Sequence, residues 1–221
     1  MNNLLLLFIE IICAFGGLLL LKKYFGKVGV ISWVAMATIL ANIITAKTVN
    51  LLGLSTALGT VLFASVFLAT DILNECYDKE SAKMAIRLGL LSNVVLIVFT
   101  QLALRYIPNS YDYANGAMQT LFGLNLRISL ASMIMYYISN MLDIALFNKI
   151  KEKTNGKMLW LRNNVSTILC NCIENFFFIA LAFYGIYDIT TVLIIAGSTS
   201  IIEILVAICD TPFLYLAKKI K

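Results

Sequence analysis

Residues 55–75 read STALGTVLFASVFLATDILNE, an apolar stretch that carries two carboxylates, Asp71 and Glu75, near its end. About 20 mostly apolar residues suffice for a helix that crosses a bilayer. An ionisable side chain inside such a helix costs about 2.5–3.5 kcal/mol on insertion, so it is typical of a residue that faces a cavity or a partner. The stretch therefore predicts a membrane-spanning helix with a polar face.

Six further segments of the same kind lie along the chain. Hydrophobic residues make up 61% of the 221 residues and charged residues only 13%, which leaves too little polar surface for a soluble domain of this length. We therefore expect an all-α integral membrane protein, with residues 1–221 as a single transmembrane domain in the inner cell membrane. The six segments are roughly residues 4–21, 28–46, 86–105, 125–147, 165–186 and 190–216.

The first of these segments is expected to be an additional helix on a core of six spans over residues 28–216. It is not predicted to be a signal peptide, because Lys22 and Lys23 follow the apolar run instead of preceding it. The longest polar connection, residues 107–120, is predicted to lie at a membrane surface, where its tyrosines suit the interface.

The basic residues predict the orientation of these seven spans. Fourteen of the 17 lysines and arginines fall in connections on one side of the seven-span arrangement, and only Arg105 falls in a connection on the other. Because cytoplasmic loops carry an excess of Lys and Arg, we expect the N-terminus outside and the C-terminus in the cytoplasm. The net charge of +5 then reflects membrane topology, and no nucleic-acid partner is expected.

Four of the predicted helices present carboxylates beside amides or hydroxyls. Residues at i, i+3 and i+4 share one helix face, and both Asp71-Asn74-Glu75 and Asn171-Glu174-Asn175 have this spacing. The other two helices contribute Ser139, Asn140 and Asp143, and Thr199, Glu203 and Asp210. These faces predict one shared cavity, although the same groups could serve only to bond the helices together. Glu10 in the first segment could likewise be a packing residue or have a peripheral role.

The polar faces indicate what kind of ligand such a cavity would take. A carboxylate accepts two parallel N–H bonds, which the donor edge of a guanine-type ring offers, and Asn can meet the ring carbonyl. Phenylalanines such as those at positions 176–178 could stack on the ring, or could face lipid. From the residues alone, the ligand is a polar organic solute with donor groups, or a cation or proton.

Motifs for enzymatic chemistry and for metal or cofactor binding are absent from the sequence. The chain has no histidine, and its five cysteines form no CxxC pair, so no metal site is predicted. It also lacks a Walker A loop, HExxH and GxSxG. We therefore expect no cofactor and no enzyme, although paired acids in the membrane leave an enzyme acting on lipid, or a structural subunit, as alternatives.

Two stretches are more specific than composition. They read FLATDILNE at residues 67–75, and DIALFNKIK at residues 143–151 followed by LWLRNNVST at residues 159–167. Together they resemble the queuosine precursor transporter family, once called vitamin uptake transporters, over roughly residues 38–216. The resemblance implies a plasma-membrane importer of 7-deazaguanines for tRNA modification: 7-cyano-7-deazaguanine, 7-aminomethyl-7-deazaguanine or queuine.

The resemblance also carries residues over from the family. Many members have Asp where this chain has Glu174, which is one methylene longer. Other family features fall on Asp71, Arg127, Asp143, Arg162, Ser166, Thr167 and Asn171. The predicted substrate-binding residues are Glu174, Asn171, Asp143, Asp71, Asn74, Asn140 and Arg127. The residues predicted for coupling or gating are Glu75, Arg162, Glu203 and Asp210.

The expected mechanism is secondary transport by alternating access around a site near the middle of the membrane. Coupling to protons and facilitated diffusion both fit the sequence. The alternative within transport is a substrate-binding subunit of a vitamin importer that a separate ATPase energises. A homodimer could form through the first span or through a small-residue face such as Gly53/Ala57.

Overall fold

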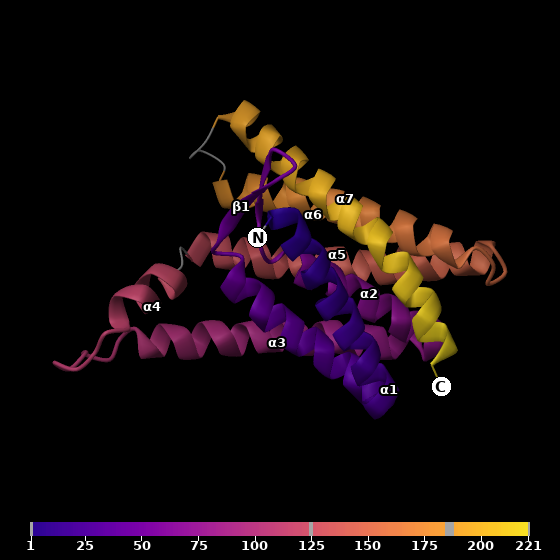
Figure 1. Ribbon diagram of the computed structural model, residues 1–221, viewed down its shortest axis with the longest axis horizontal. Helices are drawn as coiled ribbons and strands as arrows, with labels where there is room; N and C mark the ends of the chain where they lie inside the picture. Colours follow the sequence, from indigo (N-terminus) through magenta and orange to yellow (C-terminus); the bar gives the residue numbers. More distant parts are fainter. Residues whose placement is uncertain (1, 124–125, 184–187, 221) are drawn as a thin grey trace.

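The computed structural model describes residues 2–123, 126–183 and 188–220, and these residues are mainly helical (Figure 1). Its helices are α1 (Asn3–Ile44), α2 (Thr60–Cys76), α3 (Lys79–Ala103), α4 (Asn115–Phe122), α5 (Leu126–Lys153), α6 (Leu159–Phe183) and α7 (Ile189–Lys219). Within the described residues, α1, α3, α5, α6 and α7 are long and apolar enough to cross a membrane. The chain is therefore a multi-pass membrane protein.

Helix α1 consists of two halves that fold back on each other at Gly26. This glycine has φ 57° and ψ −137°, a backbone conformation that L side chains rarely adopt. In a straight helix, residues 17 and 33 would lie about 24 Å apart. A Cβ atom built on Gly17 would instead lie 3.3 Å from the Trp33 ring. The two halves correspond to the predicted segments 4–21 and 28–46.

The first half of α1 is packed into the bundle. Phe15 and Leu18 are fully buried, and the Phe15 ring meets Phe213 of α7 edge to face at a centroid distance of 5.2 Å. At the hinge end, Lys22 is buried and donates a hydrogen bond of 2.8 Å to the carbonyl oxygen of Ile220. The N-terminal segment is therefore an integral part of the fold.

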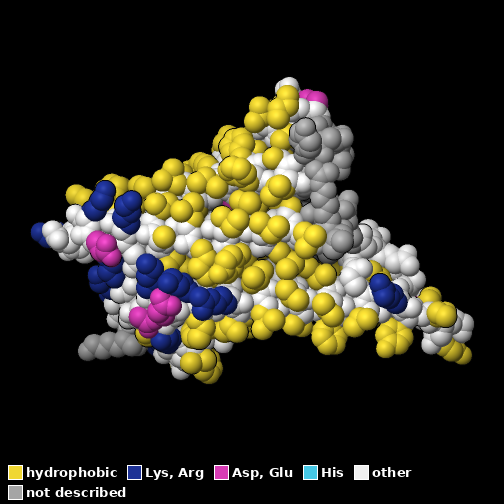
Figure 2. All heavy atoms as spheres, turned by 180° about the vertical axis from the view of Figure 1, so that it is seen from behind, with side chains coloured by type: hydrophobic (Ala, Val, Ile, Leu, Met, Phe, Trp, Pro, Cys, Tyr) yellow, Lys and Arg dark blue, Asp and Glu magenta, His cyan; other side chains and the backbone are white. Residues whose placement is uncertain are grey.

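Helix α2 lies at the centre, where it contacts α1, α3, α5 and α7. Its 17 residues extend over about 26 Å. Its apolar side chains Leu68, Ile72 and Leu73 are fully buried. Figure 2 shows one face of the molecule, on which hydrophobic side chains cover the middle while most Lys and Arg side chains gather at one end. This distribution matches a bundle whose outer surface meets lipid.

A β-hairpin precedes α2, and the prediction of a helix from residue 55 was wrong for this segment. Strands β1 (Thr48–Leu51) and β2 (Leu54–Ala57) pair antiparallel. Leu52 (φ 53°) and Gly53 (φ 80°) both have positive φ, as a two-residue type I′ turn requires. Because Gly53 and Ala57 lie in this hairpin, they form no small-residue helix face for a dimer.

Helix boundaries also differ from the prediction on the charged side of the bundle. Helix α3 begins at Lys79, seven residues before the predicted start, because the Asp78 side chain caps it by accepting a 2.7 Å hydrogen bond from the Ser81 backbone N–H. Hydrogen bonds from the Ser81 hydroxyl and from Lys27 lower the pKa of Asp78 to about 2.

The predicted polar connection, residues 107–120, contains the start of the short helix α4, and its Tyr111 and Tyr113 are almost fully exposed.

Candidate functional site

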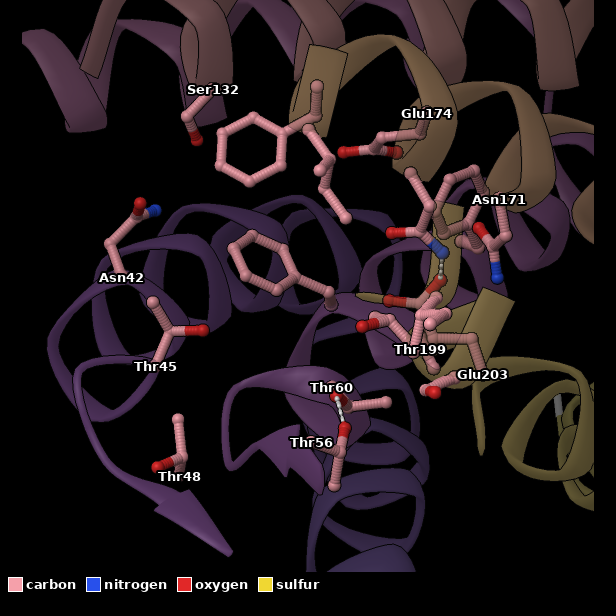
Figure 3. Close-up of a pocket in the computed structure, with 18 residues that line it drawn as sticks. Asn42, Thr45, Thr48, Thr56, Thr60, Ser132, Asn171, Glu174, Thr199 and Glu203 are labelled. Carbon is pink, nitrogen blue, oxygen red and sulfur yellow. Dashed lines mark hydrogen bonds between the residues drawn. The ribbon is translucent and has the colours of Figure 1, made fainter. Parts of the chain in front are cut away.

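A cavity of about 510 Å³ opens between the helices on the side of the bundle where the β-hairpin lies (Figure 3). Its volume falls in the range of pockets for small organic ligands. Residues from α1, both strands, α2, α5, α6 and α7 line it. They are Asn42, Thr45, Thr48, Thr56, Thr60, Phe63, Ala64, Phe67, Ser132, Asn171, Glu174, Asn175, Phe178, Ile179, Ile194, Ser198, Thr199 and Glu203.

Two carboxylates, Glu174 of α6 and Glu203 of α7, face this cavity. Ser139 Oγ of α5 donates to Glu174 Oε2 at 2.5 Å, and Asn175 Nδ2 donates to Glu203 Oε2 at 2.6 Å. Asn175 Nδ2 also lies 3.1 Å from Ser200 Oγ. A carboxylate offers about four acceptor positions, so each acid keeps capacity for a ligand after these bonds. The two acids can therefore bind a donor-rich molecule or a cation.

Three phenylalanines supply flat apolar surface to the same cavity: Phe63 and Phe67 of α2, and Phe178 of α6. Aromatic side chains stack on nucleobase-like rings without a need for hydrogen bonds. Phe177, the neighbour of Phe178, is instead exposed on the outside of the bundle. Only one member of the 176–178 run therefore reaches the cavity.

The opposite wall of the cavity is neutral and polar. Figure 3 shows Asn42, Thr45 and Ser132 on the side away from Glu174 and Glu203. Asn42 Nδ2 donates to Asn93 Oδ1 of α3 at 2.9 Å. The sequence pattern did not predict this wall. Asn42 could have indicated this wall, because it is a polar residue in an apolar segment. A single amide in a membrane helix, however, more often bonds to a neighbouring helix than to a ligand.

The predicted site residues that the structure describes divide into three groups. Glu174, Asn171 and Glu203 line the cavity. Asp71, Asn74, Asn140, Asp143 and Asp210 are buried and do not line it, while Glu75 and Arg162 lie at the basic end of the bundle. We call the buried set, together with Asn163 and Ser166, the inner polar cluster. The side chain of Arg127 lies outside the described residues. Three of the predicted residues therefore line the cavity, and the other described ones lie elsewhere in the bundle.

The inner polar cluster has unused hydrogen-bonding capacity. Thr167 Oγ1 lies 3.4 Å from Asp143 Oδ1, and Asn163 Nδ2 donates to Asp210 Oδ1 at 2.6 Å. Both oxygens of Asp71 and the second oxygens of Asp143 and Asp210 have no partner among the described residues. Asp71 is close enough to Asp143 and Asp210 for electrostatic interaction. Buried carboxylates without hydrogen-bond partners are costly, so this cluster is not explained by helix packing alone.

At the basic end of the bundle, ion pairs of the Glu75 side chain connect α2 to three other helices. The Glu75 carboxylate accepts hydrogen bonds from Arg162 of α6 at 2.5 Å and from Lys218 of α7 at 2.7 Å, and Lys151 of α5 lies 3.2 Å away. Arg162 is fully buried, and its guanidinium also bonds the carbonyl oxygens of Gly156 and Lys157. We call Glu75, Arg162, Lys151 and Lys218 the basic-end network.

The described residues contain no group of three or more His, Cys, Asp or Glu side chains with the geometry to hold a metal ion. The inner carboxylates are therefore not arranged as a metal centre in this conformation.

A bundle of long apolar helices with a polar cavity between them defines a multi-pass membrane protein with a candidate internal binding site. The family model described as "Putative vitamin uptake transporter" matches residues 57–217. The chain therefore belongs to this family of transporters, which also bears the name queuosine precursor transporters.

Individual relatives agree with the family match. The "Probable queuosine precursor transporter" of Bacillus subtilis is 37% identical over 219 residues, which cover 99% of this chain and 95% of the relative. The "Queuosine precursor transporter" of Escherichia coli is 26% identical over 144 residues, 65% of this chain and 62% of the relative. No solved structure matches the chain.

Proposed function

We propose that this chain imports queuosine precursors, which are 7-deazaguanines, across the bacterial cell membrane for tRNA modification. The observation that carries the proposal is the cavity, which combines two carboxylates, Glu174 and Glu203, with amides and three phenylalanines. This set of groups complements a flat ring with a donor edge. The names of the relatives from Bacillus subtilis and Escherichia coli support the same class of substrate.

In the proposed binding mode, Glu174 accepts the N1–H and exocyclic amine hydrogens of the ring. Ser139 fixes the orientation of this carboxylate through its 2.5 Å hydrogen bond. Asn171 meets the ring carbonyl, and Phe67 or Phe178 stacks on the ring face. Glu203 holds Asn175 in place and offers a second acceptor.

The proposed topology has seven crossings, two of which are the halves of α1. Lys27, next to the hinge, pairs with Asp78 of the α2–α3 connection at 2.9 Å, and Lys218, near the C-terminus, pairs with Glu75 at the end of α2, so these three segments meet at one end of the bundle. This shared basic end supports a cytoplasmic location under the positive-inside rule. The N-terminus and the β-hairpin would then lie on the outer side.

The structure would correspond to a state that is open outward and closed inward. Helix α2 begins at Thr60, which lines the cavity, and reaches Glu75 of the basic-end network about 22 Å further along its axis. Because this network ties α5, α6 and α7 to α2, it would close the cytoplasmic side. Its rupture would open the inner side in an alternating-access cycle.

We further propose that the inner polar cluster carries the proton that couples import to the proton gradient. Asp71, Asp143 and Asp210 are fully buried and lie between the cavity and the basic-end network along the chain's central helices. Intramembrane acids of this kind mark proton relays in many transporters. The role of Asp143 and Asp71 in coupling is therefore distinct from direct contact with the ring.

Uptake of labelled 7-cyano-7-deazaguanine into cells that cannot make the compound tests the proposed function. Expression of the chain should give uptake that an excess of unlabelled 7-deazaguanine abolishes. Expression of the Glu174→Gln, Glu203→Gln double variant at the same membrane level should give none. Uptake no greater than in cells with an empty vector would overturn the proposal.

A further inference from the structure

A second, smaller cavity of about 110 Å³ adjoins the main one, between α1, α3, α4 and α5. The two cavities share a wall, formed by Asn42, Thr45, Ser132 and Phe178. We call the smaller one the side cavity. Its volume is about a fifth of that of the main cavity, so it suits a small substituent and not a second ring system.

The side cavity lies beyond the wall that faces the two carboxylates. Figure 3 shows Asn42 and Ser132 across the main cavity from Glu174 and Glu203. A ring whose N1–H and amine edge is bound to a carboxylate would therefore direct its opposite, five-membered edge toward this wall. In a 7-deazaguanine, that edge carries the substituent at position 7.

The part of the side cavity's lining that the structure describes is uncharged. None of the described residues around it is an Asp, Glu, Lys or Arg. Its polar groups include the Asn42–Asn93 amide pair, with 2.9 Å between Nδ2 and Oδ1, while Leu96, Ile97 and Met133 supply apolar surface. A cation that entered this space would lose hydration without gaining a counter-charge, whereas a neutral group with one acceptor atom would lose little.

From this arrangement we infer that the side cavity is the subsite for a small, uncharged substituent on the ring edge opposite the carboxylates. The inference rests on the proposed function and specifies its substrate class. The chain binds 7-deazaguanines with a neutral group at position 7, such as a nitrile, in preference to those with a cationic aminomethyl group. Selectivity then comes from α1, α3 and α5, and the carboxylates recognise only the common ring.

Adjacent residues of α3 offer a matched pair of variants. Ile97 lines the side cavity, and Val98 is exposed on the outer surface of the bundle. Ile97→Phe adds volume inside the side cavity, whereas Val98→Phe adds the same ring toward lipid. Binding of three ligands to the purified chain would be measured: unsubstituted 7-deazaguanine, the 7-cyano compound and the 7-aminomethyl compound.

Wild-type chain should bind the 7-cyano compound about tenfold or more tightly than the 7-aminomethyl compound. Ile97→Phe should weaken binding of the 7-cyano compound by about tenfold and leave binding of the unsubstituted ring within about twofold. Val98→Phe should change neither affinity.

Two results would overturn the inference. One is equal or tighter wild-type binding of the 7-aminomethyl compound, which needs no variant and so does not depend on the folding of Ile97→Phe. The other is an equal loss of affinity, in Ile97→Phe, for unsubstituted 7-deazaguanine and for the 7-cyano compound. If wild-type chain binds none of the three ligands, the proposed function itself fails and the inference falls with it.

Discussion

Ser139 Oγ donates a hydrogen bond to Glu174 Oε2 across the contact between α5 and α6, with 2.5 Å between the two oxygens. Among the described residues, the other oxygen of this carboxylate accepts no hydrogen bond. The serine therefore orients the acid while leaving one face of it for a ligand in the cavity. This relationship makes Glu174 the first residue to test.

Glu174→Gln should weaken binding of 7-deazaguanine, because the amide replaces one acceptor oxygen with a donor that opposes the donor edge of the ring. A hydrogen bond to a charged group contributes about 1.5–3 kcal/mol, so the loss in affinity should be about 10- to 100-fold. Calorimetry on purified chain measures it. Glu10→Gln is the matched control, since Glu10 does not line the cavity. If wild type and Glu174→Gln bind 7-deazaguanine with equal affinity, the proposed binding mode is wrong.

Phe178→Ala should also weaken binding, because the ring of Phe178 lines both cavities at their shared wall. Stacking of an aromatic side chain on a base contributes about 1–3 kcal/mol by alanine substitution. The neighbouring Phe177 is 59% exposed, so Phe177→Ala controls for loss of apolar surface on the same helix. If both variants bind 7-deazaguanine as tightly as wild type does, Phe178 does not stack on the substrate.

Glu75→Gln should destabilise the protein strongly. The fully buried Arg162 loses the carboxylate that compensates its charge, and breaking a buried ion pair costs about 3–5 kcal/mol. Thermal unfolding in detergent should show a clear drop in Tm. Glu80→Gln removes an exposed pair with Lys83 and should leave Tm nearly unchanged. A similar Tm for both variants would mean that the basic-end network does not hold the helices together.

Asp143→Asn should uncouple import from the proton gradient, because an amide cannot release a proton at physiological pH. Proteoliposomes of this variant should show the same uptake with and without an imposed inward proton gradient, while wild type responds to it. Asp78→Asn is the control, since Asp78 is exposed in the connection between α2 and α3. An unchanged response in Asp143→Asn would remove Asp143 from the coupling pathway.

Reporter fusions test the proposed topology. Green fluorescent protein at the C-terminus should fluoresce in living cells, as expected for a cytoplasmic end. Alkaline phosphatase fused after Asn109, between α3 and α4, should be active, and the same enzyme fused after Gly156, between α5 and α6, should be inactive. The reverse pattern would contradict the orientation of the chain.

The apolar runs and the basic residues predicted much of the fold. Runs of about 20 apolar residues are a strong signal for helices, and they located both halves of α1 and helices α3, α5, α6 and α7. The predicted grouping of basic residues appears in space as the contacts of Glu75 and Asp78. The β-hairpin was missed because its four-residue strands are shorter than the window in which a membrane helix is recognised.

The candidate site was harder to predict than the helices. The spacing of Asn171, Glu174 and Asn175 placed them on one face, and the structure puts all three on the cavity. Spacing within one helix cannot tell which acids of different helices meet. Asp71 and Glu203 both lie on polar faces, yet packing places Asp71 in the inner polar cluster and Glu203 on the cavity. The neutral wall at Asn42 and Ser132 depends in the same way on how α1 and α5 pack.

Uptake of labelled 7-cyano-7-deazaguanine by proteoliposomes that contain this chain alone would establish whether the chain itself transports a queuosine precursor. We expect saturable uptake by wild type without ATP or a partner protein, and uptake close to that of empty liposomes when Glu174→Gln and Glu203→Gln are combined. Failure of the purified, folded wild-type chain to transport the compound, or normal transport by the double variant, would contradict the proposed function.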